Sequence, residues 1–512
     1  MNILNSPVQG FVKGKIFMTI RLLAHIPRDA KPIMKLLQEF AKDELELVFS
    51  LGDKDADIKA SSLSKMSTQV GKSGHLVSGT DFTGARHAVI SSPSYFEDME
   101  RFVDQLQRAG PAYSYKANNL QNLQDYIDYY HILLDVVADR IVKSRATHML
   151  FFDLPHLGYD TVFYQTGLAL GLKPILLTQS LFPGKFFSME KIYDFGLFPT
   201  SENCDQPYKI EGLSDLNLFY MKNIRQGEQG TGRITPRSLI NLLIYIALKE
   251  PKKFLKPLWI LDTIKRISAI YGVFPKWRDP FARFFNMSDI AYFEHLSEFE
   301  QKPIDLKQKF VYFALQLQPE MTTSAIGQKY RDQVLAIEDL ARILPPDVKI
   351  YVKENPKQMG FARGPMYFHR MSRIKTVEMM PSYANTHSLT DAAVAVATIS
   401  GTVGWEALCK KKRVICFGHT WYSGLPGVLT FDEHTTWSDI QDLSVNHADL
   451  EQSTGTLVAR AHHGILHRHY MRELADFDNS ENQRVVAQTI LSLLRGEADY
   501  TFPSNKSADY SS

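Results

Sequence analysis

The chain is poor in cysteine. Its 512 residues include only Cys204, Cys409 and Cys416, which are too few for a disulfide framework or a cysteine metal cluster. Cys409 and Cys416 stand in apolar surroundings typical of a protein core. We therefore expect a reducing, cytoplasmic compartment and no metal site.

Long apolar runs and an excess charge of one sign are also absent. No run reaches the roughly 18 apolar residues of a membrane-spanning helix, and residues 1–14 are polar, so we expect neither a transmembrane segment nor a signal peptide. The formal net charge is +2, with no arginine-rich tract, which gives no indication of nucleic-acid binding. With 44% apolar and 22% charged residues, the composition is that of a globular protein of several domains.

Strand-like and helix-like segments alternate in the first 199 residues. Residues 148–152 and 174–178 are apolar strand candidates, residues 87–91 are a shorter one, and residues 123–143 have helical periodicity. Such alternation predicts a parallel sheet with helices on both faces.

The alternation stops near residue 200 and returns at residue 309. In between, residues 233–278 carry ten Lys and Arg against two acidic residues, interleaved with Trp, Leu and Phe. This composition suits a membrane-surface helix, and it equally suits a helical insert packed between domains. We predict four segments: an α/β domain (1–199), a basic helical insert (200–308), a second α/β domain (309–480), and a C-terminal helix and tail (481–512).

One stretch of the second domain reads as strand, turn, helix and strand. The turn contains Ser400, Gly401, Thr402 and Gly404, and it follows an apolar strand that ends at Ile399. Backbone N–H groups at a helix N-terminus attract phosphate, and glycine lets the ligand approach. A plain helix start, with Ser400 or Thr402 as N-cap, fits the same residues.

This stretch resembles a known family. Ser-Gly-Thr-x-Gly-Trp-Glu-Ala-Leu at 400–408, followed by Val-Ile-Cys-Phe-Gly-x-x-Trp-Tyr at 414–422, is similar to the signature of bacterial capsule polysaccharide biosynthesis proteins. That family includes Kdo transferases and related surface-glycan glycosyltransferases of the GT-B type. Four further segments match it: Pro-His-x-Gly-x-Asp at 155–160, Gln-Ser-Leu-Phe-Pro-x-x-Phe at 179–186, Gln-Pro-Glu-x-Thr-Thr at 318–323 and Val-Lys-Glu-x-Pro at 352–356.

The resemblance implies a fold and a reaction. The fold is α/β and GT-B-like, with two Rossmann-like domains facing a cleft, a helical insert, and a last helix that crosses back to the first domain. The reaction is transfer of a sugar from a nucleotide donor to a glycan or lipid-linked acceptor. The implied donor is a CMP-sugar of Kdo or another nonulosonate, and a UDP-sugar stays open. No metal or other cofactor is required, because helix N-termini, hydroxyls and Lys can stabilise the leaving phosphate.

The chain departs from the family at one position. Where the family usually carries His-Pro, this chain has Asn355-Pro356. A histidine can donate from a charged ring, whereas asparagine donates only a neutral amide hydrogen bond. Lys353 is the candidate for the missing charge. The predicted donor-binding residues are Lys353, Glu354, Asn355, Pro356, Ser400, Gly401, Thr402, Gly404, Glu406, Trp421 and Tyr422.

Several of these residues also have a structural interpretation. Glu406 suits a ribose hydroxyl or a solvated helix surface. Trp421 and Tyr422 suit the wall of a base or sugar site, or the protein core.

The acceptor must lose a proton, which calls for a base. The candidates are Asp153, His156 and Asp160 of the first domain and Glu320 of the second, with Gln179 and Ser180 on the acceptor side. The first-domain residues follow strands, and ligands of such sheets bind at the carboxyl ends of strands. Alternatively, Asp153 or Asp160 caps the next helix and His156 is an ordinary loop histidine.

Two other functions stay open. One is a different nucleotide-sugar enzyme, a UDP-sugar transferase or a UDP-GlcNAc 2-epimerase-like protein. The other is a non-catalytic capsule assembly protein that binds a membrane or partner through its basic insert, because Asn355 weakens the donor site.

Overall fold

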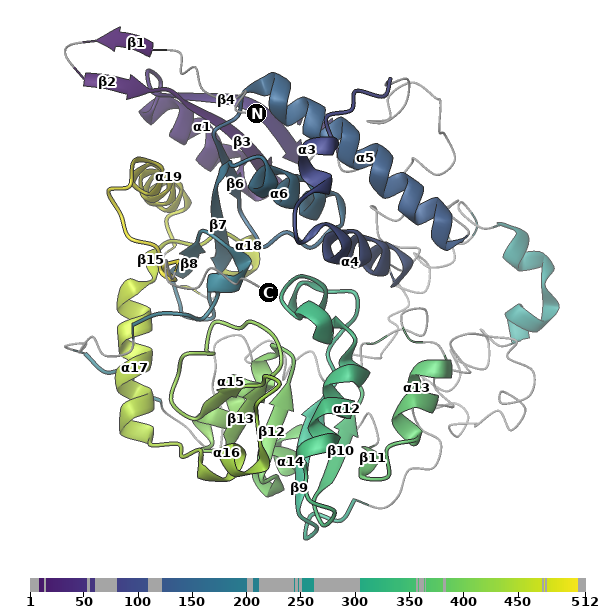
Figure 1. Cartoon of the computed structure of the whole chain (residues 1–512). Helices are drawn as coiled ribbons and strands as arrows, with labels where there is room; N and C mark the ends of the chain where they lie inside the picture. Colours follow the sequence, from purple (N-terminus) through teal and green to yellow (C-terminus); the bar gives the residue numbers. More distant parts are fainter. Residues whose placement is uncertain are drawn as a thin grey trace.

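The structure is a computed structural model of the chain (Figure 1). It describes residues 9–12, 15–52, 56–59, 81–108, 122–199, 206–210, 244, 247, 251–261, 304–355, 358, 363, 365–380, 384–471, 474 and 477–504. Most of the predicted insert (200–308), part of the loop after residue 52, and Pro356 therefore lie outside the described residues.

The first domain is built on a seven-stranded sheet of order β15-β8-β7-β6-β3-β4-β5. Strands β3 to β7 pair in parallel, and β8 and β15 extend the sheet in antiparallel fashion. A separate hairpin, β1 with β2, precedes the sheet. The strands are β1 (Gln9–Val12), β2 (Lys15–Met18), β3 (Ile20–Ile26), β4 (Leu45–Gly52), β5 (Ile58–Lys59), β6 (His148–Phe151), β7 (Lys173–Gln179), β8 (Lys185–Met189) and β15 (His462–His463).

Helices cover both faces of this sheet, because side chains alternate between faces along each strand. Leu22 and Ala24 of β3 pack with α1 and α19, while Leu23 packs with α4, α5 and α6. The helices of this domain are α1 (Lys31–Phe40), α3 (His87–Ile90), α4 (Tyr95–Arg108), α5 (Leu123–Ser144), α6 (Tyr159–Ala169) and α19 (Asn479–Arg495). Residues 87–91, predicted as a strand, thus form the short helix α3.

The second domain has a six-stranded, fully parallel sheet of order β11-β10-β9-β12-β13-β14. In chain order this is 3-2-1-4-5-6, the order of the dinucleotide-binding Rossmann fold. The strands are β9 (Phe310–Ala314), β10 (Lys349–Lys353), β11 (Val377–Met380), β12 (Ala395–Thr398), β13 (Arg413–Cys416) and β14 (Val428–Thr430). The helices are α12 (Gln333–Ile343), α13 (Pro365–Ser372), α14 (Thr386–Ala392), α15 (Thr402–Cys409), α16 (Trp437–Asp442) and α17 (His447–Arg460); the short helix α18 (Arg468–Met471) follows β15 on the side of the first domain. Two Rossmann-like α/β domains confirm the predicted fold class.

After α17 the chain returns to the first domain. Strand β15 pairs with β8, and Val486 and Ile490 of α19 pack against Ile33 and Leu37 of α1. Figure 1 shows this yellow end of the chain beside the purple first domain. This is the crossing that the family resemblance implied.

The two domains share one apolar cluster near the carboxyl ends of their strands. The Phe182 ring, just after β7, lies 5.4 Å from the Trp421 ring and 6.3 Å from the Trp405 ring of the second domain. An ion pair of 2.9 Å joins Glu100 on α4 to Arg331. The carboxyl ends of the two sheets therefore meet.

Among the described residues, no helix combines the length and the apolar character needed to cross a membrane.

Candidate functional site

The strand order of the first sheet reverses between β3 and β6, which is where ligands of such sheets bind. Asp153 lies just after β6 at this point. Its Oδ1 accepts hydrogen bonds from Leu154 N at 2.9 Å and from Thr178 Oγ1 at 3.3 Å. Its Oδ2 lies 3.8 Å from Nε2 of His467. Hydrogen bonds to Oδ1 therefore fix the carboxylate, while Oδ2 faces the imidazole of His467.

Asp160 builds the turn that starts α6. Its buried carboxylate accepts backbone N–H groups of His156 at 3.1 Å, Leu157 at 2.7 Å and Thr161 at 2.7 Å. The N-cap of α6 is Gly158, without a side-chain cap hydrogen bond, so Asp160 is not the N-cap and instead holds the preceding loop to the first turn of the helix. The three hydrogen bonds also fix the backbone of His156, whose Nδ1 lies 2.6 Å from the Leu154 carbonyl oxygen.

Charged groups of both domains affect the pKa of His156. Burial lowers its pKa, but the carboxylates of Asp153 and Asp160, the Leu154 carbonyl and Glu320 outweigh that effect and raise it. Glu320 follows β9 of the second domain, where its carboxylate accepts a hydrogen bond from Thr322 N at 2.9 Å. The structure thus brings together the four predicted catalytic residues, Asp153, His156, Asp160 and Glu320.

Sequence reasoning missed four residues of this neighbourhood, His25, Tyr159, His467 and Tyr470. His25 at the end of β3 is buried, with Nε2 3.2 Å from the Tyr159 hydroxyl. Burial lowers the pKa of His25. His467 and Tyr470 arrive from the C-terminal crossing, and burial together with Asp153 raises the pKa of Tyr470. His25 is the second-last residue of β3, so the rule that ligands bind at the ends of strands could have found it.

Gln179 and Ser180 serve the local backbone. Gln179 Nε2 donates to the Lys185 carbonyl at 2.9 Å, and its Oε1 accepts from Leu466 N at 2.8 Å and His467 N at 3.3 Å. The buried Ser180 hydroxyl donates to the Lys185 carbonyl at 2.6 Å. Both residues hold neighbouring backbone segments in place, and their role on the acceptor side stays a prediction.

In the second sheet the order reverses between β9 and β12, and the turn at 400–404 lies there. The N-cap of α15 is Gly401, without a side-chain cap hydrogen bond. The expectation of Ser400 or Thr402 as N-cap is therefore wrong. Ser400 Oγ donates to the Thr322 carbonyl at 2.5 Å, Gly401 N donates to Thr398 Oγ1 at 3.1 Å, and Thr402 is exposed.

Gly404, Trp421 and Tyr422 lie in the core. A Cβ on Gly404 would lie 2.3 Å from the Tyr422 hydroxyl, which donates to the Gly401 carbonyl. Tyr422 is fully buried and Trp421 nearly so. Gly404 is required because the Tyr422 hydroxyl occupies the space that a side chain would fill. Trp421 and Tyr422 therefore pack against the core side of the turn at 400–404.

The segment after β10 is also packed tightly. Lys353 and Glu354 are buried, and Glu354 Oε1 accepts a hydrogen bond from Asn355 N at 2.8 Å. Glu406 is half-buried on α15 and adds to the effect of burial in raising the pKa of Tyr312.

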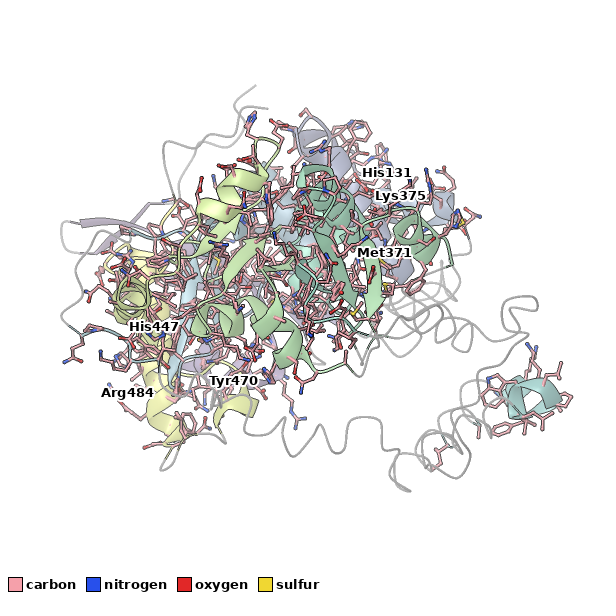
Figure 2. The ribbon with its side chains drawn as sticks, turned by 90° about the horizontal axis from the view of Figure 1, so that it is seen from below. His131, Met371, Lys375, His447, Tyr470 and Arg484 are labelled. Atoms are coloured by element: carbon pink, nitrogen blue, oxygen red, sulfur yellow. The ribbon has the colours of Figure 1, made fainter. Side chains whose placement is uncertain are left out.

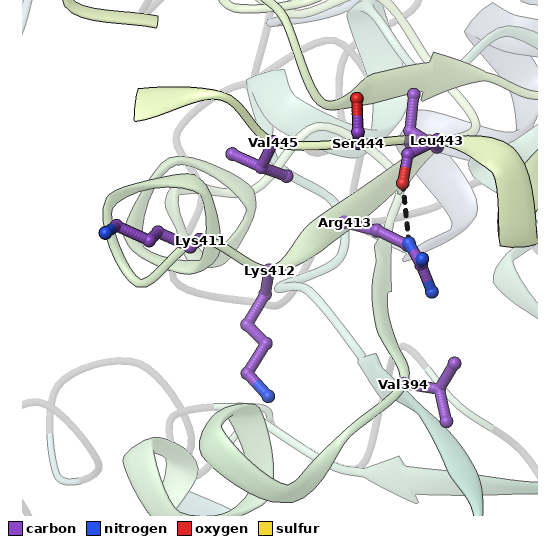
Figure 3. Close-up of a pocket in the computed structure, with 7 residues that line it drawn as sticks. All are labelled: Val394, Lys411, Lys412, Arg413, Leu443, Ser444 and Val445. Atoms are coloured by element: carbon purple, nitrogen blue, oxygen red, sulfur yellow. Dashed lines mark hydrogen bonds between the residues drawn. The ribbon is translucent and has the colours of Figure 1, made fainter. Parts of the chain in front are cut away.

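Two pockets lie away from these residues. One, of about 360 Å³, is at the amino end of β13 (Figure 3) and is lined by Val394, Lys411, Lys412, Arg413, Leu443, Ser444 and Val445. The other, of about 530 Å³, lies between β4 and α5. Within the described part of the chain, no group of three or more His, Cys, Asp or Glu side chains could hold a metal ion.

A family model for capsule polysaccharide biosynthesis proteins matches residues 288–457. This segment belongs to the capsule polysaccharide biosynthesis family. The match confirms the resemblance read from the sequence, and this capsule-family segment contains β9 to β14 and the turn at 400–404. Asp153, His156 and Asp160 lie outside it.

No curated protein matches the chain. Solved structures similar to it include the β-Kdo 2,7 transferase of Thermosulfurimonas dismutans KpsC, at 11% identity and a TM-score of 0.28, covering 69% of this chain and 89% of that one. The β-Kdo 2,4 transferase of the same KpsC has 14% identity and a TM-score of 0.25, covering 60% and 79%. UDP-GlcNAc 2-epimerase from Neisseria meningitidis bound to UDP-GlcNAc has 10% identity and a TM-score of 0.19, covering 93% and 100%.

Proposed function

We propose that this protein is a glycosyltransferase of bacterial surface polysaccharide biosynthesis. The donor is a CMP-sugar of Kdo or another nonulosonate, and the acceptor is a glycan or glycolipid. One observation carries the proposal. The N-terminus of α15, which has no side-chain cap, lies at the point where the strand order of the second sheet reverses. It belongs to the same domain interface as His156 and the carboxylates around it in the first domain.

The donor phosphate is assigned to the first turn of α15. Helix N-termini attract anions through backbone N–H groups and the helix dipole. Gly401 lets the Gln316 amide pack directly against the turn, because a Cβ there would lie 2.4 Å from Gln316 Nε2. The exposed Thr402 hydroxyl adds a donor, and Lys353 at the end of β10 adds a positive charge. This set stabilises a leaving nucleotide without a required metal.

The acceptor reacts from the first-domain side. Its hydroxyl oxygen attacks the anomeric carbon, the bond from that carbon to the phosphate oxygen breaks, and the nucleotide leaves with the bonding electrons. The acceptor proton passes to a base in the group around Asp153.

A nucleotide panel tests this proposal. The midpoint of thermal unfolding is measured with CMP, CDP, UMP, UDP, GDP or no addition, because a ligand that binds only the folded state raises its stability. We expect CMP to raise the midpoint most. If UDP alone raises the midpoint, the donor is a UDP-sugar and not a CMP-sugar. If no nucleotide changes the midpoint, the result favours the non-catalytic assembly protein.

We also propose that the protein acts in the cytoplasm at the inner membrane surface, through residues 233–278. The described part of this region contains η4 (Pro251–Leu255) and helical residues 257–261, drawn in teal and apart from both domains in Figures 1 and 2. Leu255 is 81% exposed and Leu258 59%. Exposed lysines at 252 and 256 accompany them, a combination typical of interfacial helices on anionic lipid.

Vesicle sedimentation tests the membrane contact. The full chain should sediment with phosphatidylglycerol vesicles and far less with phosphatidylcholine vesicles. The double variant Leu255→Asp with Leu258→Asp should stay in the supernatant. Leu306→Asp is the matched control, since Leu306 is an exposed leucine outside the region. Equal sedimentation of the double variant and the control would exclude this surface.

A further inference from the structure

The C-terminal crossing places a histidine at the first-domain site. The chain leaves β15, and Leu466 N and His467 N both donate to Oε1 of Gln179 at the end of β7. The Tyr470 N–H then closes a turn on the His467 carbonyl at 3.0 Å. These bonds fix the backbone of His467 next to Asp153, with Nε2 3.8 Å from Oδ2.

The two partners of this pair are not equivalent. Asp153 is held through Oδ1 by a backbone N–H and by Thr178, and its side chain is 26% exposed. The His467 side chain is 38% exposed. The carboxylate is thus the fixed member, and the imidazole is the member that an acceptor can reach.

Two of the other basic groups nearby are less suited to meet an acceptor. Asp160 is buried and accepts three backbone N–H groups, and His25 is buried against Tyr159. His156 donates from Nδ1 to the Leu154 carbonyl, which leaves its Nε2 as the competing proton acceptor.

We infer that His467 is the base that takes the acceptor proton, and that Asp153 is its positioning residue. This rests on the proposed transferase function. With Nε2–H turned toward the Asp153 carboxylate, Nδ1 is the nitrogen that accepts the hydroxyl proton. The acceptor oxygen then bonds to the anomeric carbon, and the nucleotide departs. The resulting imidazolium is stabilised by the adjacent carboxylate, as in other pairs of histidine and carboxylate.

The pair predicts a particular kinetic response. In Asp153→Asn the charge that stabilises the imidazolium is lost, so proton removal should slow while substrate binding changes little. The other titratable groups around Asp153 are His25, His156, Asp160 and Tyr470, with Glu320 acting on His156. All of them remain in that variant.

The test uses the full chain with CMP-Kdo as donor and water as the acceptor, and the release of CMP is measured at several CMP-Kdo concentrations to give kcat and KM. We expect His467→Gln to lower kcat about 100-fold or more, the usual range for loss of a general base, with KM changed less than about threefold. His463→Gln is the matched control, because His463 is an exposed histidine of the same crossing. It should stay within about twofold of the wild type.

Asp153→Asn supplies the second readout. It should lower kcat about tenfold or more with KM changed less than about threefold, and adding it to His467→Gln should lower kcat no further, because residues that act as a unit are not additive. Full activity in His467→Gln, or a further loss of kcat when Asp153→Asn is added to it, would overturn the inference while leaving the transferase intact. A wild-type protein that releases no nucleotide from CMP- or UDP-sugars would overturn the proposed function and the catalytic role of His467 together.

Discussion

Nε of Arg363 lies 2.8 Å from Oε2 of Glu354, and neither side chain is more than 2% exposed. The guanidinium also donates to the Gln316 carbonyl and the Tyr367 hydroxyl, both at 2.6 Å. Burial raises the pKa of Glu354, and the Arg363 charge opposes that rise. This buried ion pair ties the segment after β10 to the end of β9, and it sets the position of Asn355 through the hydrogen bond from Asn355 N to Glu354.

Removing one member of this pair should destabilise the second domain. Arg363→Met leaves a buried carboxylate without its cation, which costs about 3–5 kcal/mol. Glu354→Gln should cost less, because Arg363 keeps its carbonyl and hydroxyl acceptors. The double variant should be more stable than the sum of the two costs implies. Urea unfolding followed by tryptophan fluorescence measures these changes, and the exposed Arg373→Met is the control. Equal midpoints for Arg363→Met and Arg373→Met would contradict the prediction.

The buried carboxyl of Asp98 on α4 should make stability depend on pH. Burial raises its pKa from 3.8 to about 6, against the opposing charge of Arg101. The folded state therefore holds a proton that the unfolded state releases between pH 4 and 6. The stability that Asp98 contributes is complete below pH 4 and is lost as the pH rises through 6.

Asp98→Asn keeps the shape without the charge. At pH 8 it should be more stable than the wild type by up to about 3 kcal/mol, the equivalent of about two pKa units. The gain should vanish near pH 3.5. Thermal midpoints across this range measure the effect, and the exposed Asp128→Asn is the control. A stability difference that does not change with pH would show that the Asp98 charge is not the cause.

Local patterns predicted much of the fold and of the first-domain site. Asp153, His156 and Asp160 could be assigned to a strand end because an apolar run followed by polar residues marks that edge from nearby residues alone. The same local rules failed at residues 87–91, since an apolar run of that length fits a strand and the short helix α3 equally well.

Long-range partners were beyond such patterns. Nothing near Glu354 in the sequence points to Arg363, and nothing near Gly404 shows that the Tyr422 hydroxyl occupies the space of its missing side chain. His467 is far from Asp153 along the chain, and only the crossing of the C-terminal segment brings them together. These contacts depend on how the elements pack, which periodicity does not encode.

The two hydroxyls of the turn at 400–404 should have different roles. Ser400 Oγ is engaged with the Thr322 carbonyl, so Ser400→Ala should cost about 1 kcal/mol of stability. Thr402 is exposed at the first position of α15, so Thr402→Ala should leave stability within about 0.5 kcal/mol and weaken CMP binding about three- to tenfold, the equivalent of one hydrogen bond. Calorimetric titration with CMP measures this, with the exposed Thr430→Ala as control. Unchanged affinity in Thr402→Ala would remove that hydroxyl from the phosphate site.

Gln179 should act by holding the C-terminal crossing in place. Its side chain carries the contacts to the Lys185 carbonyl and to the backbone N–H groups of Leu466 and His467, so Gln179→Ala leaves those two N–H groups without their acceptor. Hydrogen exchange of the peptide containing residues 462–467 should accelerate about tenfold or more, because local opening then costs less free energy. Exchange in β3 and β6 should stay slow, since those strands keep their sheet bonds. Gln124→Ala is the control, because Gln124 is an exposed amide far from the crossing that donates to Asp128 within α5. Unchanged exchange at residues 462–467 in Gln179→Ala would mean that the pairing of β15 with β8 and the packing of α19 on α1 hold the crossing by themselves.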